Sequence, residues 1–159
     1  QVQLMLKPAQ LVELEDRLAA LSCPAVIDHI GMIDPAEGLS QPAFRTLMRL
    51  VGGGNCWVKL SGFYRLSHEE APYRDLADMI GALVAQAPGR MLWGSDWPHP
   101  LFSGRMPNLA DLIDPLQDWI PDAAVRRRIL VDNPADIYGF DPVASTSAGG
   151  RVQAGVHDD

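Results

Sequence analysis

A carboxylate, a hydroxyl and an imidazole occur within the six-residue segment 94–99, which reads Gly-Ser-Asp-Trp-Pro-His. The segment follows Arg90–Trp93, a short and mostly apolar run with the character of a β-strand. A carboxylate at a strand end can take a proton from water as a general base and return it to a leaving group. We therefore predict that Asp96 is the general base of a hydrolase, rather than the cap of a short helix that starts after Pro98.

Two neighbours of Asp96 and one distant histidine complete the candidate site. Ser95 and His99 could bind the substrate. His99 could instead support Asp96 without contacting the substrate itself. His29 directly follows the strand-like run Ala25–Asp28. On position alone, His29 is equally consistent with catalysis and with a hydrogen bond that ties the strand end to the next loop.

Two other charged residues lie in or next to strand-like runs. Asp28 should point to the opposite face from His29, where it would cap a helix or accept hydrogen bonds from backbone amides. Lys59 lies inside the apolar run Cys56–Leu60, so its side chain should be buried and must have a partner. Such a lysine could be purely structural.

Arg65 follows the same run after a few residues, in the sequence Gly-Phe-Tyr-Arg-Leu-Ser. A guanidinium binds a carboxylate through two parallel hydrogen bonds, so Arg65 would suit an anionic substrate. The alternative is a surface salt bridge with Glu69 or Glu70.

Alternating strands and helices must position these groups. The predicted strands are Val2–Leu6, Ala25–Asp28, Cys56–Leu60 and Arg90–Trp93, and the predicted helices are Pro8–Leu21, Gln41–Val51, Tyr73–Ala87, Leu109–Trp119, Ala123–Val131 and a short last one from Pro134. Since the strands are apolar on both faces, they should form a parallel sheet covered by helices. The carboxyl ends of its strands, where Asp96 and His29 lie, are the working edge of such folds.

Local signals define the connections between these elements. Asp122 should cap the helix that begins at Ala123, and Asn133 should cap the last helix, with Pro134 at its first position. The stretch Ser61–Pro72 is predicted to be a loop.

Composition narrows the class of protein. The chain has 159 residues, of which 47% are hydrophobic and 21% charged, with a formal net charge of −7. An acidic chain is a poor partner for a phosphate backbone, so we expect no nucleic acid. No apolar run is long enough to cross a bilayer, so we expect a cytoplasmic protein that does not enter membranes. Cys23 and Cys56 should be reduced, mostly buried thiols.

Four sequence blocks together resemble a known family. They are Val26–Gly31 (VIDHIG), Trp57–Gly62 (WVKLSG), Leu92–His99 (LWGSDWPH), and Asp132–Ala135 (DNPA) with Tyr138–Phe140 (YGF). Their order and spacing over Val2–Phe140 resemble the amidohydrolase-related family, and within it the branch of 2-pyrone-4,6-dicarboxylate lactonase-like hydrolases. The resemblance implies a (β/α)8 barrel of the TIM type, and it places the four strands as the fourth, fifth, sixth and eighth of that barrel.

The resemblance also implies roles for individual residues. His29 would help to polarise the scissile carbonyl, and Asp96 would activate the hydrolytic water. Arg65 would hold a substrate carboxylate, and His99 would be a further histidine of the active site. The family's His-x-His pair on the first strand does not occur in this sequence.

A complete barrel of this kind needs about 250 residues. We therefore expect α/β structure made of parallel βα units that form the C-terminal half of a barrel, in an N-terminally truncated chain. The partial barrel domain should span residues 1–142, and residues 143–159 should be a disordered tail.

The resulting hypothesis is a hydrolase that adds water to a lactone or ester of a small carboxylated substrate, without a required metal. One alternative is a metal-dependent decarboxylase of the same family, with a single divalent ion such as zinc. Another is a non-catalytic half barrel that needs a partner, since the open edges of its sheet favour self-association.

Overall fold

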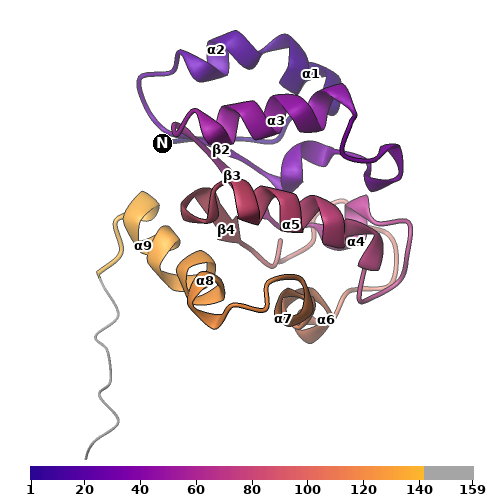
Figure 1. The fold of residues 1–159 in the computed structure, drawn as a ribbon. Helices are drawn as coiled ribbons and strands as arrows, with labels where there is room; N and C mark the ends of the chain where they lie inside the picture. Colours follow the sequence, from indigo (N-terminus) through magenta and orange to yellow (C-terminus); the bar gives the residue numbers. More distant parts are fainter. Residues whose placement is uncertain (142–159) are drawn as a thin grey trace, which may run out of the picture.

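The computed structural model describes residues 1–141, and four parallel β-strands lie at its centre (Figure 1). The strands are β1 (Val2–Leu4), β2 (Ala25–Ile27), β3 (Cys56–Leu60) and β4 (Met91–Trp93), hydrogen-bonded to one another in this order. The predicted parallel α/β fold is therefore confirmed. The predicted tail, 143–159, lies outside the described residues.

Nine α-helices in residues 1–141 connect or follow the strands. They are α1 (Pro8–Glu13), α2 (Glu15–Ala19), α3 (Pro42–Gly52), α4 (Phe63–Leu66), α5 (Ala77–Gln86), α6 (Leu109–Ile113), α7 (Pro115–Trp119), α8 (Ala123–Arg127) and α9 (Asn133–Tyr138). The predicted helix Pro8–Leu21 is divided into α1 and α2, and the predicted helix Leu109–Trp119 is divided into α6 and α7. The division between α6 and α7 falls before Pro115, whose nitrogen has no hydrogen to donate.

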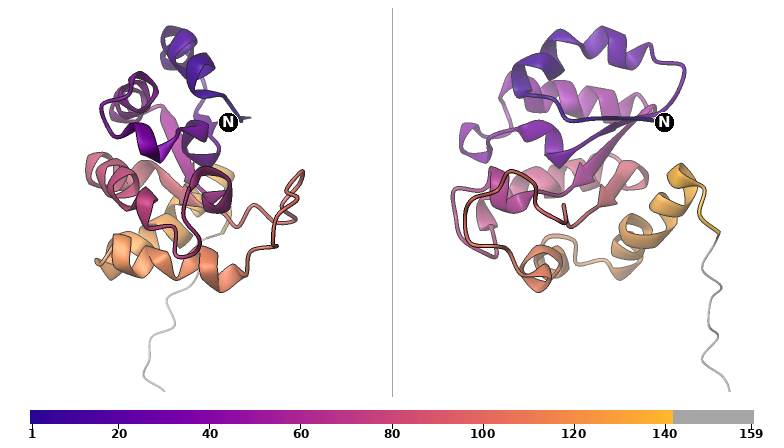
Figure 2. Two further views of the ribbon diagram at one scale, coloured as in Figure 1. Left: turned by 90° about the vertical axis from the view of Figure 1, so that its right-hand side faces the viewer. Right: turned by 180° about the vertical axis from the view of Figure 1, so that it is seen from behind.

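The sheet has an apolar layer on each face, and the two layers differ in size. The larger core joins one face, with Ile27, Val58 and Leu60, to the helices that cover it. Figure 2 shows in its left view that α3 and α5 stack on this side, while the loop that follows β4 extends on the other. On that second face Val26, Trp57 and Leu92 form a smaller cluster, against which Ile137 and Tyr138 of α9 pack. The second face is the one from which the candidate site opens.

The segment Ser61–Pro72 differs from its prediction. It is not a loop throughout, since Phe63–Leu66 forms the single helical turn α4 directly after β3. Phe63 is buried in the main core and holds this turn against the helical layer. The turn matters because it carries Arg65.

Asn133 was predicted to cap α9, and that prediction is wrong. Its side-chain amide instead donates to the carbonyl oxygens of Pro88 at 2.8 Å and Met91 at 2.7 Å, so it ties α9 to the start of β4. Asp122 does cap α8, as predicted, because its carboxylate accepts from the backbone amide of Ala124.

Among residues 1–141, no helix combines the length and the apolar character needed to cross a membrane.

Replacing Asn133 by alanine should destabilise the chain. The change leaves two backbone carbonyls without their donor at a side chain that is only 1% exposed. Unsatisfied buried groups cost about 1–3 kcal/mol, so the free energy of unfolding in urea should fall by that amount. Gln117→Ala, at an exposed position of α7, is the matched control and should change little; equal losses in the two variants would contradict the assigned role.

Candidate active site

The candidate site lies at the carboxyl ends of β2, β3 and β4. A cavity of about 430 Å³ opens there, lined by Gln3, Asp28, His29, Lys59, Ser61, Trp93, Gly94, Ser95, Asp96, Trp97 and Tyr138. Three of the sequence-predicted site residues, His29, Asp96 and Ser95, are thus brought to one cavity. Asp96 does not cap a helix, since residues 94–108 contain none.

A left-handed turn aims the His29 side chain. Residues 29–32 all have positive φ, between 50° and 66°, although only one of them is glycine. Each non-glycine residue in this region costs of order 1 kcal/mol, so the surrounding structure must enforce the turn. The imidazole is buried, and its Nδ1 lies 2.8 Å from Ser61 Oγ.

Gly62 provides the space for this imidazole. Its φ is +65°, and a Cβ added there would lie 2.9 Å from His29 Nδ1. The glycine is therefore required both for its backbone conformation and for the close approach of the ring. His29 Nε2 faces Asp96 Oδ1 at 3.7 Å. The tautomer that suits both neighbours carries its hydrogen on Nε2, with Nδ1 accepting from the Ser61 hydroxyl.

The other oxygen of Asp96 is held from the α4 turn. Tyr64 Oη donates to Asp96 Oδ2 at 2.5 Å, and Arg65 Nε donates to the same oxygen at 2.6 Å. Arg65 Nη2 also donates to the carbonyl oxygen of Pro100 at 2.7 Å, which fixes the loop after Asp96. The Asp96 side chain is only 12% exposed, so these donors compensate a charge that is largely removed from water.

His99 contacts Tyr64, the residue that donates to Asp96. Its Nδ1 lies 3.1 Å from Tyr64 Oη, and the two rings meet edge to face. Ser95 Oγ accepts from the backbone amide of Trp97 at 3.2 Å and remains on the cavity wall. Arg65 pairs with Asp96 rather than with Glu69 or Glu70.

Opposing influences set the charge states of the two central groups. Burial raises the pKa of Asp96, but hydrogen bonds from Tyr64 and Arg65 and the nearby positive charge outweigh it, so the pKa lies below its ordinary value. Burial lowers the pKa of His29, and the negative charges of Asp96 and Asp28 only partly offset this. Near neutral pH the site therefore holds an ionised carboxylate beside a neutral imidazole.

Asp28 corrects another prediction. It neither caps a helix nor binds backbone amides; its Oδ1 pairs with Lys59 Nζ at 2.9 Å, and both its oxygens accept from Gln3 Nε2. Lys59 has the partner that its position required. Tyr64 and Ser61 were missed by the sequence reasoning, although their places beside Arg65 and directly after β3 could have indicated them.

The described residues do not fit a complete metal site. Within 1–141 no three His, Cys, Asp or Glu side chains are grouped to hold a metal ion. His29 and Asp96 would provide two ligands, whereas catalytic zinc sites have three from the protein. Asp96 Oδ2 is also engaged by Arg65 and Tyr64.

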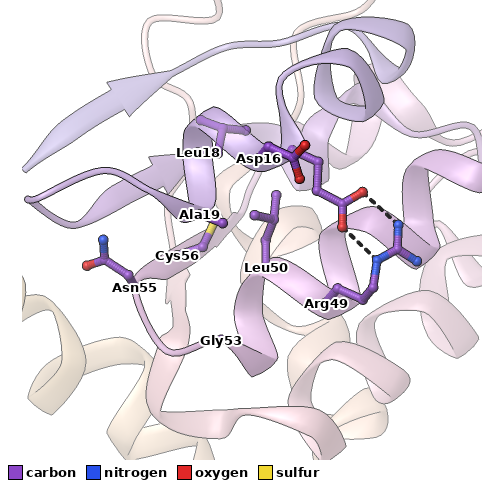
Figure 3. Close-up of a pocket in the computed structure, with 9 residues that line it drawn as sticks. Asp16, Leu18, Ala19, Arg49, Leu50, Gly53, Asn55 and Cys56 are labelled. Carbon is purple, nitrogen blue, oxygen red and sulfur yellow. Dashed lines mark hydrogen bonds and ion pairs between the residues drawn. The ribbon is translucent and has the colours of Figure 1, made fainter.

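A smaller hollow of about 190 Å³ lies at the opposite end of β3, beside α2 and α3 (Figure 3). An ion pair between Arg49 and Glu15, 2.6 Å long, borders it. Cys56 at this hollow is buried, which raises the pKa of its thiol to about 12, and Cys23 is half-buried; both thiols are free, as predicted. This hollow is not part of the candidate site.

Ionisable side chains at the carboxyl ends of parallel strands, with helices behind them, are typical of parallel α/β enzymes, among them the (β/α)8 barrels. Residues 1–140 match the sequence model of the family described as "Amidohydrolase". The chain therefore belongs to the amidohydrolase family. The predicted membership is thereby confirmed.

Individual relatives agree with this assignment. The chain is 44% identical over 128 residues to the 4-sulfomuconolactone hydrolase of Hydrogenophaga intermedia, covering 79% of this chain and 42% of the relative. It is 33% identical over 146 residues to the 2-pyrone-4,6-dicarboxylate hydrolase of Comamonas testosteroni, covering 86% and 48%. A crystal structure of a probable 2-pyrone-4,6-dicarboxylic acid hydrolase from Acinetobacter baumannii superposes with a TM-score of 0.74 at 30% identity, covering 88% of this chain and 52% of that one.

The chain thus spans about half the length of the relatives it matches. Its four parallel strands correspond to half of a (β/α)8 barrel, as the sequence predicted. The predicted numbering of these strands as fourth, fifth, sixth and eighth is wrong, because β3 is hydrogen-bonded directly to β4 and the four strands are therefore consecutive.

The two histidines with shifted pKa values should titrate in opposite directions. His29 should titrate below the 6.5 of a free histidine, because burial disfavours its cation. His68 should titrate above it, because it lies 2.8 Å from the carboxylate of Asp34 on the surface. NMR titration of the imidazole signals measures both in one sample, and a His29 pKa at or above that of His68 would contradict the described site.

Removing the Tyr64 hydroxyl should raise the pKa of Asp96. Tyr64→Phe deletes the hydrogen bond to Oδ2 and leaves the burial that opposes ionisation. NMR titration of the Asp96 carboxyl carbon measures the change. Tyr73→Phe, at a buried tyrosine that packs on Phe63 and does not contact Asp96, is the control and should leave the Asp96 pKa unchanged. An unchanged value in Tyr64→Phe would show that this contact does not set the acidity.

Proposed function

We propose that this chain carries the general base and the carbonyl-polarising group of a lactone hydrolase. The observation that supports this most directly is the division of labour at Asp96. Oδ2 is engaged by Tyr64 and Arg65, whereas Oδ1 lies 3.7 Å from His29 Nε2, and the residue lines the cavity. An ionised carboxylate with one fixed and one available oxygen is suited to receive a proton from water.

The proposed reaction follows from this geometry. Water bound at Asp96 Oδ1 attacks the lactone carbonyl carbon as its proton passes to that oxygen. The carbonyl oxygen becomes an oxyanion, which the neutral His29 stabilises by donating from Nε2. When the tetrahedral intermediate collapses, the bond from carbon to the ring oxygen breaks and Asp96 returns its proton to the leaving oxygen.

Ser61 and Gly62 support the electrophilic role of His29. The Asp96 carboxylate, which can only accept, favours the tautomer with its hydrogen on Nε2, and the Ser61 hydroxyl can then donate to Nδ1 and hold the ring in place. Since His29 has a lowered pKa, it is uncharged near neutral pH and acts as a hydrogen-bond donor rather than as a cation.

We propose a small carboxylated lactone, or a similar anionic ester, as the substrate. The names of the relatives, 4-sulfomuconolactone hydrolase and 2-pyrone-4,6-dicarboxylate hydrolase, support this class. The Acinetobacter baumannii structure holds citric acid, which is likewise a polycarboxylate. Arg65 uses Nε for Asp96 and Nη2 for Pro100, so its Nη1 is available to bind a substrate carboxylate. Ser95 would contact the substrate from the cavity wall, and His99 would support Tyr64.

The other expectations from the sequence stay predictions. They are the alternative of a zinc-dependent decarboxylase, a half barrel that needs a partner, self-association through the open sheet edge, and a cytoplasmic location.

Asp96→Asn should strongly slow the hydrolysis of 2-pyrone-4,6-dicarboxylate or 4-sulfomuconolactone by this chain. General base catalysis contributes about 10²–10⁴-fold, so the rate of ring opening, followed by absorbance, should fall at least 100-fold. Asp118→Asn, at an exposed position of α7, is the matched control and should retain the wild-type rate.

Two results would contradict the proposal. Equal rates for Asp96→Asn and the wild type would remove Asp96 from the mechanism, and no turnover of either lactone by the wild-type chain would count against the activity itself. The wild-type rate should also fall at acid pH, where the Asp96 carboxylate becomes protonated.

A further inference from the structure

The cavity contains a second cation, Lys59, which the reaction above does not use. Lys59 lies on β3 two residues after Trp57, so both side chains point to the sheet face from which the cavity opens. The side chain is 18% exposed, and its ammonium lies 2.9 Å from Asp28 Oδ1. A lysine that is this far removed from water requires a partner, and this one also lines the cavity that contains His29 and Asp96.

Asp28 takes only part of the hydrogen-bonding capacity of Lys59. The Asp28 carboxylate is also satisfied by Gln3, whose Nε2 lies 3.1 Å from Oδ1 and 3.0 Å from Oδ2. An ammonium has three N–H donors, and in residues 1–141 Asp28 is its one ion-pair partner. Two donors are therefore left for a ligand.

Gly94 makes room for the Lys59 stem. Its φ is outside the left-handed region, so conformation does not require glycine there. A Cβ added at Gly94 would lie 3.3 Å from Lys59 Cδ, tighter than an ordinary contact. The stem thus passes across Gly94, and this packing restricts the side chain before any ligand binds, which lowers the entropic cost of binding.

Arg65 is less available than Lys59 to a ligand in this cavity. Arg65 does not line it, and its Nε and Nη2 already donate to Asp96 and Pro100. Lys59 lines the cavity together with His29 and Asp96.

We propose that Lys59 binds an anionic group of the substrate, a carboxylate or a sulfonate, in this cavity. Asp28 and Gln3 are then positioning residues that hold the ammonium in place. This inference rests on the proposed function, because it assigns a binding residue to the same site. It adds to Arg65 a second cation for substrates that carry more than one anionic group.

Citrate binding to the full chain tests the proposal, measured by isothermal titration calorimetry. Lys59→Met keeps the length of the stem and removes the charge, and it should weaken citrate binding at least tenfold. The chain contains one other lysine, Lys7, which is exposed, so Lys7→Met removes the same charge elsewhere and should leave the affinity unchanged. No citrate binding by the wild type, or equal affinities in all three proteins, would overturn the proposal.

A purely structural role for Lys59 needs a separate test. If Lys59 only neutralises Asp28, the double variant Asp28→Asn/Lys59→Met should fold and bind citrate like the wild type, which would overturn the proposal. If Lys59 binds the anion, the double variant should be as weak as Lys59→Met, and Asp28→Asn alone, which keeps the cation, should bind more tightly than the double variant. Thermal unfolding of each variant confirms that it is folded.

The outcome is distinguishable from failure of the proposed function. Lactone turnover that depends on Asp96, together with citrate binding that ignores Lys59, would overturn only the role of Lys59. Citrate binding that depends on Lys59, without any lactone turnover, would overturn only the proposed hydrolysis.

Discussion

The charge of Asp96 is almost withdrawn from water, and the rest of the site depends on how that charge is compensated. An unpaired carboxylate in such a place costs several kcal/mol, and the group would take up a proton instead. Tyr64 and Arg65 provide the compensation at one oxygen. Since Arg65 also holds the Pro100 carbonyl, the same guanidinium that stabilises the charge fixes the path of the loop behind it. A change at Arg65 would therefore affect both the charge of Asp96 and the conformation of the loop.

The short segment after β3 organises both central groups. Ser61 orients the imidazole of His29, Gly62 gives it space, and Tyr64 and Arg65 hold Asp96. These four residues come from five consecutive positions. A single segment after β3 therefore positions the side chains that follow β2 and β4. The parallel register explains why this works, because neighbouring strands end at the same edge of the sheet.

Much of this arrangement could be predicted from the sequence, because apolar runs and strand ends are local signals. Cys56–Leu60 is a strand with the predicted bounds, and His29 and Asp96 lie in one cavity, as their strand-end positions indicated. The turn α4 could not be predicted, since a single helical turn has too little periodicity. The contact of Asp28 with Lys59 depends on register and on side-chain direction, which the residue types alone do not determine.

The backbone conformation of residues 29–32 could not be predicted from the sequence either. Four successive positive φ angles at residues 29–32 are unusual for a segment with one glycine, so tertiary contacts rather than local preference must impose them. For Asn133 the sequence suggested a common capping role, but the side chain is used for two carbonyls that are far away in the chain. In each case a long-range contact overrides a sound local expectation.

Asp28 and His29 are adjacent in the chain and yet serve different partners, the first Lys59 and the second Ser61. The change of direction comes at one peptide, where the extended strand gives way to the left-handed turn. A deletion or insertion of a single residue in β2 would exchange the faces of the two side chains. Evolution can therefore replace side chains around this cavity, and so alter what it accepts, but it has almost no freedom to alter the length of the segment that carries them.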